Sequence, residues 1–131
     1  MTISGHAHLT SKRPRSVTVI GYLIVAAGII GFAYHATEFS RQGPVEYGVV
    51  WVLLIRLLAI VGGVLMLRGA NWARWLALAW IAYHVILSAL HSWSDTVIHV
   101  GLLAGVAYVL LRPEASAYFR HTRRHHDPPA A

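Results

Sequence analysis

The chain has 131 residues, a net charge of +6 and no cysteine, and 56% of its residues are hydrophobic while 12% are charged. This charged share is well below that of an ordinary soluble domain, which indicates a membrane protein. Without cysteine there is no disulfide, no cysteine-ligated iron–sulfur cluster and no thiol nucleophile. The basic residues lie at the ends of apolar segments rather than along one folded face, which argues against a nucleic-acid partner.

Four apolar segments follow a polar, basic stretch at residues 1–15, which we expect to be a mobile cytoplasmic arm. Each is close to the length of about 20 residues that an α-helix needs to cross the hydrocarbon of a bilayer. They cover residues 16–36, 48–67, 72–91 and 96–111. Turn signals separate them at Gly43-Pro44, at Arg68-Gly69 and at residues 92–95, and Arg112-Pro113 ends the fourth.

The sequence therefore predicts an all-α integral membrane four-helix bundle over residues 16–112, followed by a basic cytoplasmic tail at 113–131. The first apolar segment is longer than the roughly 7–15 residues of a signal-peptide core, so we expect it to remain as a membrane anchor.

Lysine and arginine predict the orientation, because positively charged loops resist translocation. With the N-terminus inside, nine basic residues are cytoplasmic: Lys12, Arg13, Arg15, Arg68, Arg74, Arg112, Arg120, Arg123 and Arg124. Arg41 lies on the opposite side with Glu38, Glu46 and Asp95. We therefore expect both termini in the cytoplasm.

Two stretches carry a resemblance. They are Arg68-Gly-Ala-Asn-Trp-Ala-Arg74, which enters the third segment, and Leu111-Arg-Pro-Glu-Ala-Ser-Ala-Tyr-Phe-Arg120, which follows the fourth. Together with the membrane region of roughly 100 residues, they resemble small four-helix bacterial inner-membrane proteins of uncharacterised families. The resemblance implies a fold and a multi-pass location in the bacterial inner membrane, and no chemistry.

Arg56 is the clearest charge inside a predicted span. It lies about 12 Å from the outer end of its segment at 1.5 Å per residue, close to the membrane midplane. It shares a helix face with Ala59 and Gly63, whose small side chains leave space for a guanidinium or a neighbouring helix. Two interpretations stay open: an arginine that reaches an outer carboxylate, and one that binds an anion or another ligand.

Histidines gather in the predicted outer half of the membrane. Each histidine belongs to a helix face defined by three- and four-residue spacing. The faces are Trp80, His84, Ser88 and His91 on the third segment; Gly21, Gly28, Gly31, His35 and Glu38 on the first; and Asp95 and His99 on the fourth. The Asp95 carboxylate is expected to accept a hydrogen bond from the His99 ring and to fix its tautomer.

Histidine binds haem and is the commonest metal ligand. We single out His84 and His99 as the pair that would bind a haem cofactor. A transition metal such as Zn, Fe or Cu would instead use His35, Glu38, His91 and Asp95. No tight metal motif such as His-Glu-x-x-His occurs. Two other interpretations stay open: hydrogen bonding between helices alone, and a small polar substrate or a proton relay.

Gly101 and Gly105 form a GxxxG pattern that lets a helix of this chain or of a second copy approach closely. No segment carries a catalytic, nucleotide or transport motif. We therefore expect a non-enzymatic membrane protein, an accessory or assembly subunit, whose partners are the lipid bilayer and a second copy or a membrane complex. The alternatives are a haem- or metal-binding redox protein and a small dimeric transporter or channel.

Overall fold

The computed structural model describes the backbone of residues 12–39 and 47–124, with side chains for residues 12–37 and 47–120. All regular structure in these ranges is α-helical. The helices are α1 (Arg15–Phe39), α2 (Tyr47–Leu67), α3 (Asn71–Ala89), α4 (Trp93–Leu111) and α5 (Pro113–Arg124). The first four coincide with the four apolar segments. The predictions for residues 1–11, for the Gly43-Pro44 turn and for residues 125–131 lie outside the described residues.

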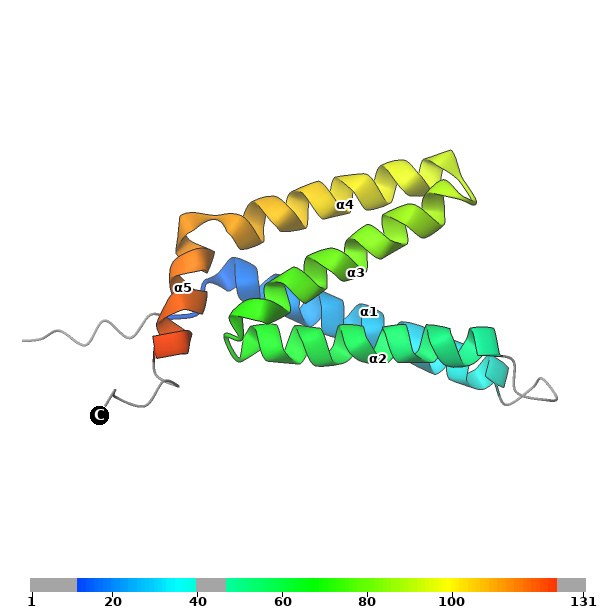
Figure 1. Ribbon diagram of the computed structural model, residues 1–131, viewed down its shortest axis with the longest axis horizontal. Helices are drawn as coiled ribbons and strands as arrows, with labels where there is room; N and C mark the ends of the chain where they lie inside the picture. The colour runs from blue at the N-terminus through cyan, green and yellow to red at the C-terminus, as the bar shows by residue number, and fades with distance from the viewer. Residues whose placement is uncertain (1–11, 40–46, 125–131) are drawn as a thin grey trace, which may run out of the picture.

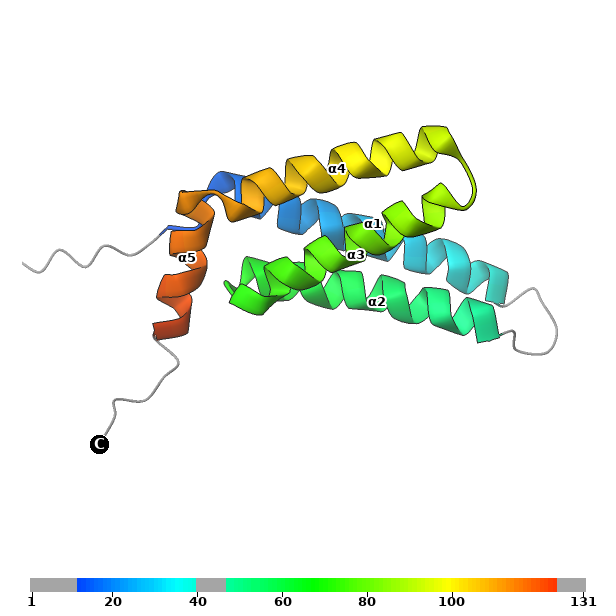
Figure 2. The same ribbon diagram turned by 45° about the horizontal axis from the view of Figure 1, so that its top comes forward.

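Helices α1 and α2 lie antiparallel as one hairpin, and α3 and α4 form a second (Figures 1 and 2). Helix α3 begins beside the end of α2 and then diverges from it, so the first turns of α2 and α4 lie far apart. The start of α1, the end of α4 and all of α5 lie together at the opposite end. We call this the α5 end, and the other the far end.

The corner between α2 and α3 is a compact helix stop. Gly69 has a φ of 85°, which a residue with a Cβ rarely adopts. Its N–H donates to the Met66 carbonyl at 3.0 Å, and the Ala70 N–H donates to the Leu65 carbonyl at 3.0 Å. These two bonds define a Schellman motif, which satisfies carbonyls left free at the end of α2. The Arg68-Gly69 signal in the sequence thus ends α2 at Leu67.

A serine cap starts α4 earlier than the sequence suggests. The Ser92 hydroxyl accepts a hydrogen bond from the Asp95 N–H at 3.4 Å, and Ser92 has the extended backbone of an N-cap residue. Helix α4 therefore begins at Trp93 and has 19 residues.

Helix α5 is not among the predicted elements, because Pro113 indicates only a helix stop in the sequence. Arg112 is extended, with φ −58° and ψ 151°, so α4 does end there. Proline is also favoured as the first residue of a helix, since its missing N–H needs no partner there. In α5, Ala115 and Phe119 are four residues apart on one face, and both are buried.

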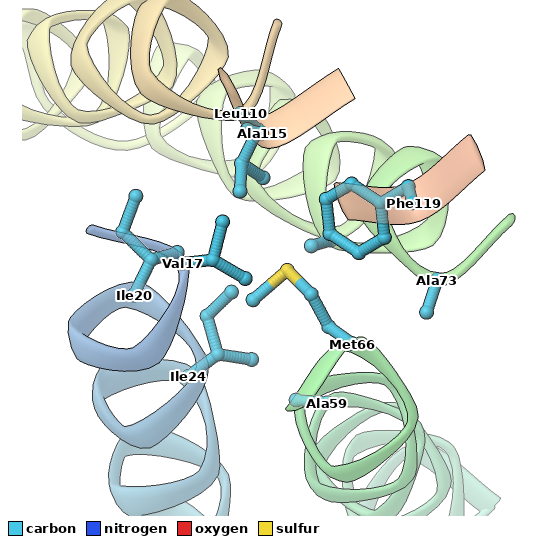
Figure 3. Packing of buried hydrophobic residues seen from close by; sticks show 10 residues of the cluster. Val17, Ile20, Ile24, Ala59, Met66, Ala73, Leu110, Ala115 and Phe119 are labelled. Carbon is cyan, nitrogen blue, oxygen red and sulfur yellow. The ribbon is translucent and has the colours of Figure 1, made fainter. Parts of the chain in front are cut away.

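The buried apolar core lies at the α5 end, where side chains from all five helices meet (Figure 3). Its members are Val17, Ile20, Ile24, Ala59, Met66, Ala73, Ala77, Leu110, Ala115 and Phe119. Phe119, Met66 and Leu110 are completely buried.

Hydrogen bonds tie the same end together. The Leu67 carbonyl at the end of α2 accepts from Arg13 Nη1 at 2.8 Å and from Tyr118 Oη at 3.1 Å. Arg74 Nη1 donates to Ser116 Oγ at 3.1 Å. Helix α5 is therefore hydrogen-bonded to both hairpins: Tyr118 bonds to α2, and Ser116 bonds to α3.

Three of the described helices are long and apolar enough to cross a membrane: α1 over Arg15–Thr37, α2 and α4. Helix α3 has 19 residues but is not among them, because polar residues such as Asn71, Arg74 and His84 lower its mean hydropathy.

Candidate functional site

Arg56 lies in the third turn of α2, with its side chain against Gly31 of α1. A Cβ added to Gly31 would lie 2.7 Å from Arg56 Nε and 2.8 Å from its Cδ, so any larger residue would displace the arginine. On the other side, Arg56 Cζ lies 6.0 Å from the centroid of the Trp80 ring on α3. This distance is within the range of a cation–π contact. The arginine is thus enclosed by α1 and α3.

Arg56 has no carboxylate partner among the residues whose side chains are described. An arginine at the centre of a membrane helix costs roughly 2.5–3.5 kcal/mol on insertion scales. A cation–π contact returns about 0.5–2 kcal/mol. The contacts seen here therefore offset only part of the cost. The side chain of Glu38, the nearest outer carboxylate on α1, lies outside the described side chains, so its pairing with Arg56 stays a prediction.

His84 and His99 face each other across the α3–α4 hairpin. Their ring centroids are 6.0 Å apart, and the ring planes differ by 18°. Trp80 continues this row, because its ring centroid lies 4.4 Å from that of His84. Arg56, Trp80, His84 and His99 therefore form a continuous row of side chains that runs from α2 through α3 to α4, and we call it the Arg–His row.

Backbone carbonyls set the tautomer of both rings. His84 Nδ1 lies 2.8 Å from the Trp80 carbonyl, and His99 Nδ1 lies 2.7 Å from the Asp95 carbonyl. A carbonyl only accepts, so each Nδ1 carries the proton and each Nε2 keeps a lone pair in the neutral ring. The expected contact of His99 with the Asp95 carboxylate is corrected here, since the bond is made to the Asp95 backbone. The carbonyl four residues back is the nearest acceptor for a helical histidine.

The other predicted ligands are more scattered. His91 is exposed, and its Nδ1 lies 2.8 Å from the Leu87 carbonyl. His35 is half-buried beside the Tyr34 ring, with centroids 5.2 Å apart. Among the described side chains, no three His, Asp or Glu residues gather closely enough to hold a metal ion. The set of His35, Glu38, His91 and Asp95 includes the undescribed Glu38 side chain, so it stays a prediction.

Hydroxyl groups between α3 and α4 bond to their own helices. The buried Ser88 donates to the Val85 carbonyl at 3.0 Å, and the buried Thr96 donates to the Ser92 carbonyl at 2.8 Å. Neither needs a partner from the other helix.

A hydrogen bond that the sequence does not suggest joins α2 and α3 toward the far end. Trp51 Nε1 donates to Tyr83 Oη at 3.2 Å. The sequence indicates only an interfacial anchor at Trp51, because a tryptophan at a membrane boundary is common and carries no information on its partner.

An apolar crevice borders the Arg–His row on the side of the α5 end. Its lining comes from α1, α2 and α3: Ile24, Leu58, Ala59, Gly62, Gly63, Leu76, Ala77 and Trp80. It has no room for a water molecule. The Trp80 Nε1 atom is buried and has no hydrogen-bond acceptor among the described residues.

The glycine pair of α4 faces away from the rest of the chain. A Cβ added to Gly101 or to Gly105 would meet nothing within 4 Å in the described structure. No described helix of the chain therefore packs against these two residues.

No family model, no curated protein and no solved structure matches the chain. The resemblance to small bacterial inner-membrane proteins therefore stays a prediction.

Proposed function

We propose that this protein is a multi-pass protein of the bacterial inner membrane, a four-helix bundle with both termini in the cytoplasm that acts as a non-enzymatic accessory or assembly subunit. The observation that carries the proposal is the set of three apolar helices of membrane-spanning length, in α1, α2 and α4. Helix α3 connects two of them and lies antiparallel to α4, and this arrangement supports a fourth crossing by α3. Its 19 residues span about 28 Å at 1.5 Å per residue, close to the hydrocarbon thickness of about 30 Å.

The position of the charges supports the orientation. The basic residues with described side chains, other than Arg56, all belong to segments at the α5 end: Lys12, Arg13, Arg15, Arg68, Arg74, Arg112 and Arg120. Asp95 lies at the far end, in the first turn of α4. By the positive-inside rule, the α5 end is cytoplasmic.

Reporter fusions test this topology. We expect reporters placed after Gly69 and after Ala131 to report the cytoplasm, and one inserted near Gln42 to report the periplasm. A periplasmic signal from the fusion after Ala131 would contradict the proposal.

The polar groups within the helices support a role without chemistry. Ser88 and Thr96 each donate to a carbonyl of the preceding turn, and His84, His91 and His99 each place Nδ1 against such a carbonyl, so one polar group of each side chain is bonded locally. An accessory subunit also needs a face for another membrane helix, and the open Gly101–Gly105 face of α4 has the small residues that such contacts use.

Purification from native membranes tests the role. We expect a stable partner, or a second copy, to co-purify with the wild type and to be lost with Gly101→Leu. Gly48→Leu is the matched control, because Gly48 is also open but lies in the first turn of α2. If the wild type and Gly48→Leu are both monomeric and bring down no partner, the accessory role is contradicted.

The second candidate is a haem-binding membrane protein, and the facing His84 and His99 rings favour it. Haem iron takes two axial imidazoles, whereas zinc requires three or four protein ligands, which the described side chains do not gather. Protein from cells supplied with iron and haem precursor should then show a Soret band that His84→Ala and His99→Ala each remove. His91→Ala is the control that should keep it, and a colourless wild type would reject this candidate.

A further inference from the structure

We propose that Arg56 binds an anion, a carboxylate or a phosphate group, where α1, α2 and α3 come together. The inference rests on the proposed membrane location, because inside a bilayer a guanidinium has no bulk water to hydrate it. It assigns a ligand class to one end of the Arg–His row and needs neither haem nor metal.

The donors at this place lack an acceptor. Arg56 forms no ion pair among the described side chains, although its Cζ lies 6.0 Å from the centroid of the Trp80 ring. A guanidinium offers five N–H donors in a planar fork that matches the two oxygens of a carboxylate or phosphate. The partner that Arg56 lacks is therefore an acceptor, and the positive charge of the guanidinium favours a negative one.

The guanidinium is held in place before a ligand arrives. The three Arg56 atoms nearest to a Cβ added at Gly31 are Nε, Cδ and Cζ, at 2.7, 2.8 and 3.0 Å. The stem of the arginine thus fills the gap over Gly31, and the terminal amino groups lie further from this Cβ position than Nε, Cδ and Cζ do. The Trp80 ring restrains the other face. A donor fixed in this way loses little conformational freedom on binding.

The described carboxylates do not pair with Arg56. Asp95 is exposed in the first turn of α4 and makes no ion pair with Arg56. Glu38 follows Gly31 by seven residues on α1, which places its backbone about 10 Å closer to the far end at 1.5 Å per residue.

The full-length protein in lipid nanodiscs allows a direct test. One arm compares phosphatidylcholine nanodiscs with nanodiscs that also contain phosphatidylglycerol, and native mass spectrometry counts the retained anionic lipid. The other arm adds sodium phosphate or sodium acetate to phosphatidylcholine nanodiscs and follows the melting temperature, which rises when a ligand binds the folded state. Binding in the first arm alone identifies a lipid headgroup, and binding in the second a soluble anion.

We expect Arg56→Gln to weaken the binding about tenfold or more, since it removes the charged fork. The affinity of Arg56→Lys should lie between those of the wild type and Arg56→Gln, because lysine keeps the charge but lacks the planar fork of donors. Gly31→Ala should also weaken the binding, because it displaces the guanidinium without removing it. Gly105→Ala, whose Cβ meets nothing in the described structure, should bind as the wild type does.

Two results would overturn the inference: binding in neither arm, or equal binding by the wild type and Arg56→Gln. A double-mutant cycle between Arg56→Gln and Glu38→Gln gives a third result that would overturn it. A strong coupling free energy in this cycle would identify Glu38 as the internal partner of Arg56. These results leave the topology reporters unaffected. Failure of the anion site is therefore distinguishable from failure of the proposed membrane location.

Discussion

The two ends of the molecule are built differently. At the α5 end, side chains from all five helices form the buried core, and Arg13, Tyr118 and Arg74 add hydrogen bonds between elements. Toward the far end the hairpins diverge, and no member of this core lies in the first turns of α2 and α4. The Arg–His row lies between these regions.

This contrast separates stability from ligand binding. Removing a fully buried side chain costs the transfer free energy of its atoms and leaves a cavity, so changes at the α5 end are expected to be expensive. The hairpins diverge toward the far end, so changes there are expected to cost less. Substitutions that compare the two ends test this division.

The largest effect is expected for Phe119→Ala. Phe119 is completely buried under the corner of α2 and α3, and Arg74 Cζ lies 5.5 Å from its ring centroid. A buried phenylalanine replaced by alanine typically costs about 3–5 kcal/mol of unfolding free energy. Denaturant unfolding in detergent, followed by circular dichroism, measures the loss. Phe32→Ala on the exposed side of α1 is the control, and equal losses for both would show that α5 is not part of the core.

A smaller loss is expected for Gly63→Ala, at the contact between α1 and α2. The new Cβ would lie 2.7 Å from Val25 Cγ2 and 3.1 Å from the Gly21 carbonyl oxygen, and this backbone atom cannot move away cheaply. Overpacking of this kind costs about 1–3 kcal/mol. The same unfolding measurement applies. Gly105→Ala should show no loss, or a slight gain from the better helix propensity of alanine, and a neutral Gly63→Ala would mean that α1 and α2 are less closely packed.

Sequence reasoning locates α1 to α4 because each carries a long apolar pattern and clear stop signals. The Gly69 turn and the boundary at Arg112-Pro113 are local effects, which the chain encodes within a few residues. Helix α5 escapes prediction for a related reason. Pro113 both stops one helix and starts the next. What stabilises α5 as a helix is the burial of Phe119, and this burial depends on α2 and α3.

The site is predictable in its residues and less so in its contacts. The depth of Arg56 and the small residues on its face follow from position and spacing, and the structure places Gly31 against it. The facing of His84 and His99 depends on the rotation of α3 and α4 about their axes, which periodicity restricts but does not determine. The role of Trp80 between Arg56 and His84 depends on the crossing of α2 and α3, which no local pattern encodes.

The smallest effect is expected at the far end, for Trp51→Phe. This change removes the indole N–H that donates to Tyr83 Oη at 3.2 Å and keeps most of the aromatic surface. Hydrogen bonds between membrane helices average about 0.6 kcal/mol in double-mutant cycles, so we expect a loss of that size. Tyr83→Phe removes the same bond and should cost about as much, while the double variant should lose no more than either single one.

Trp93→Phe provides the control for this cycle, since Trp93 is 84% exposed and donates no hydrogen bond within the described residues. If the pair instead couples by several kcal/mol, the far end is held as firmly as the α5 end, and the division between a rigid end and an adjustable one is wrong. If the coupling is near 0.6 kcal/mol, α2 and α3 separate there at little cost. That outcome leaves Arg56 within reach of a ligand that enters from the far end.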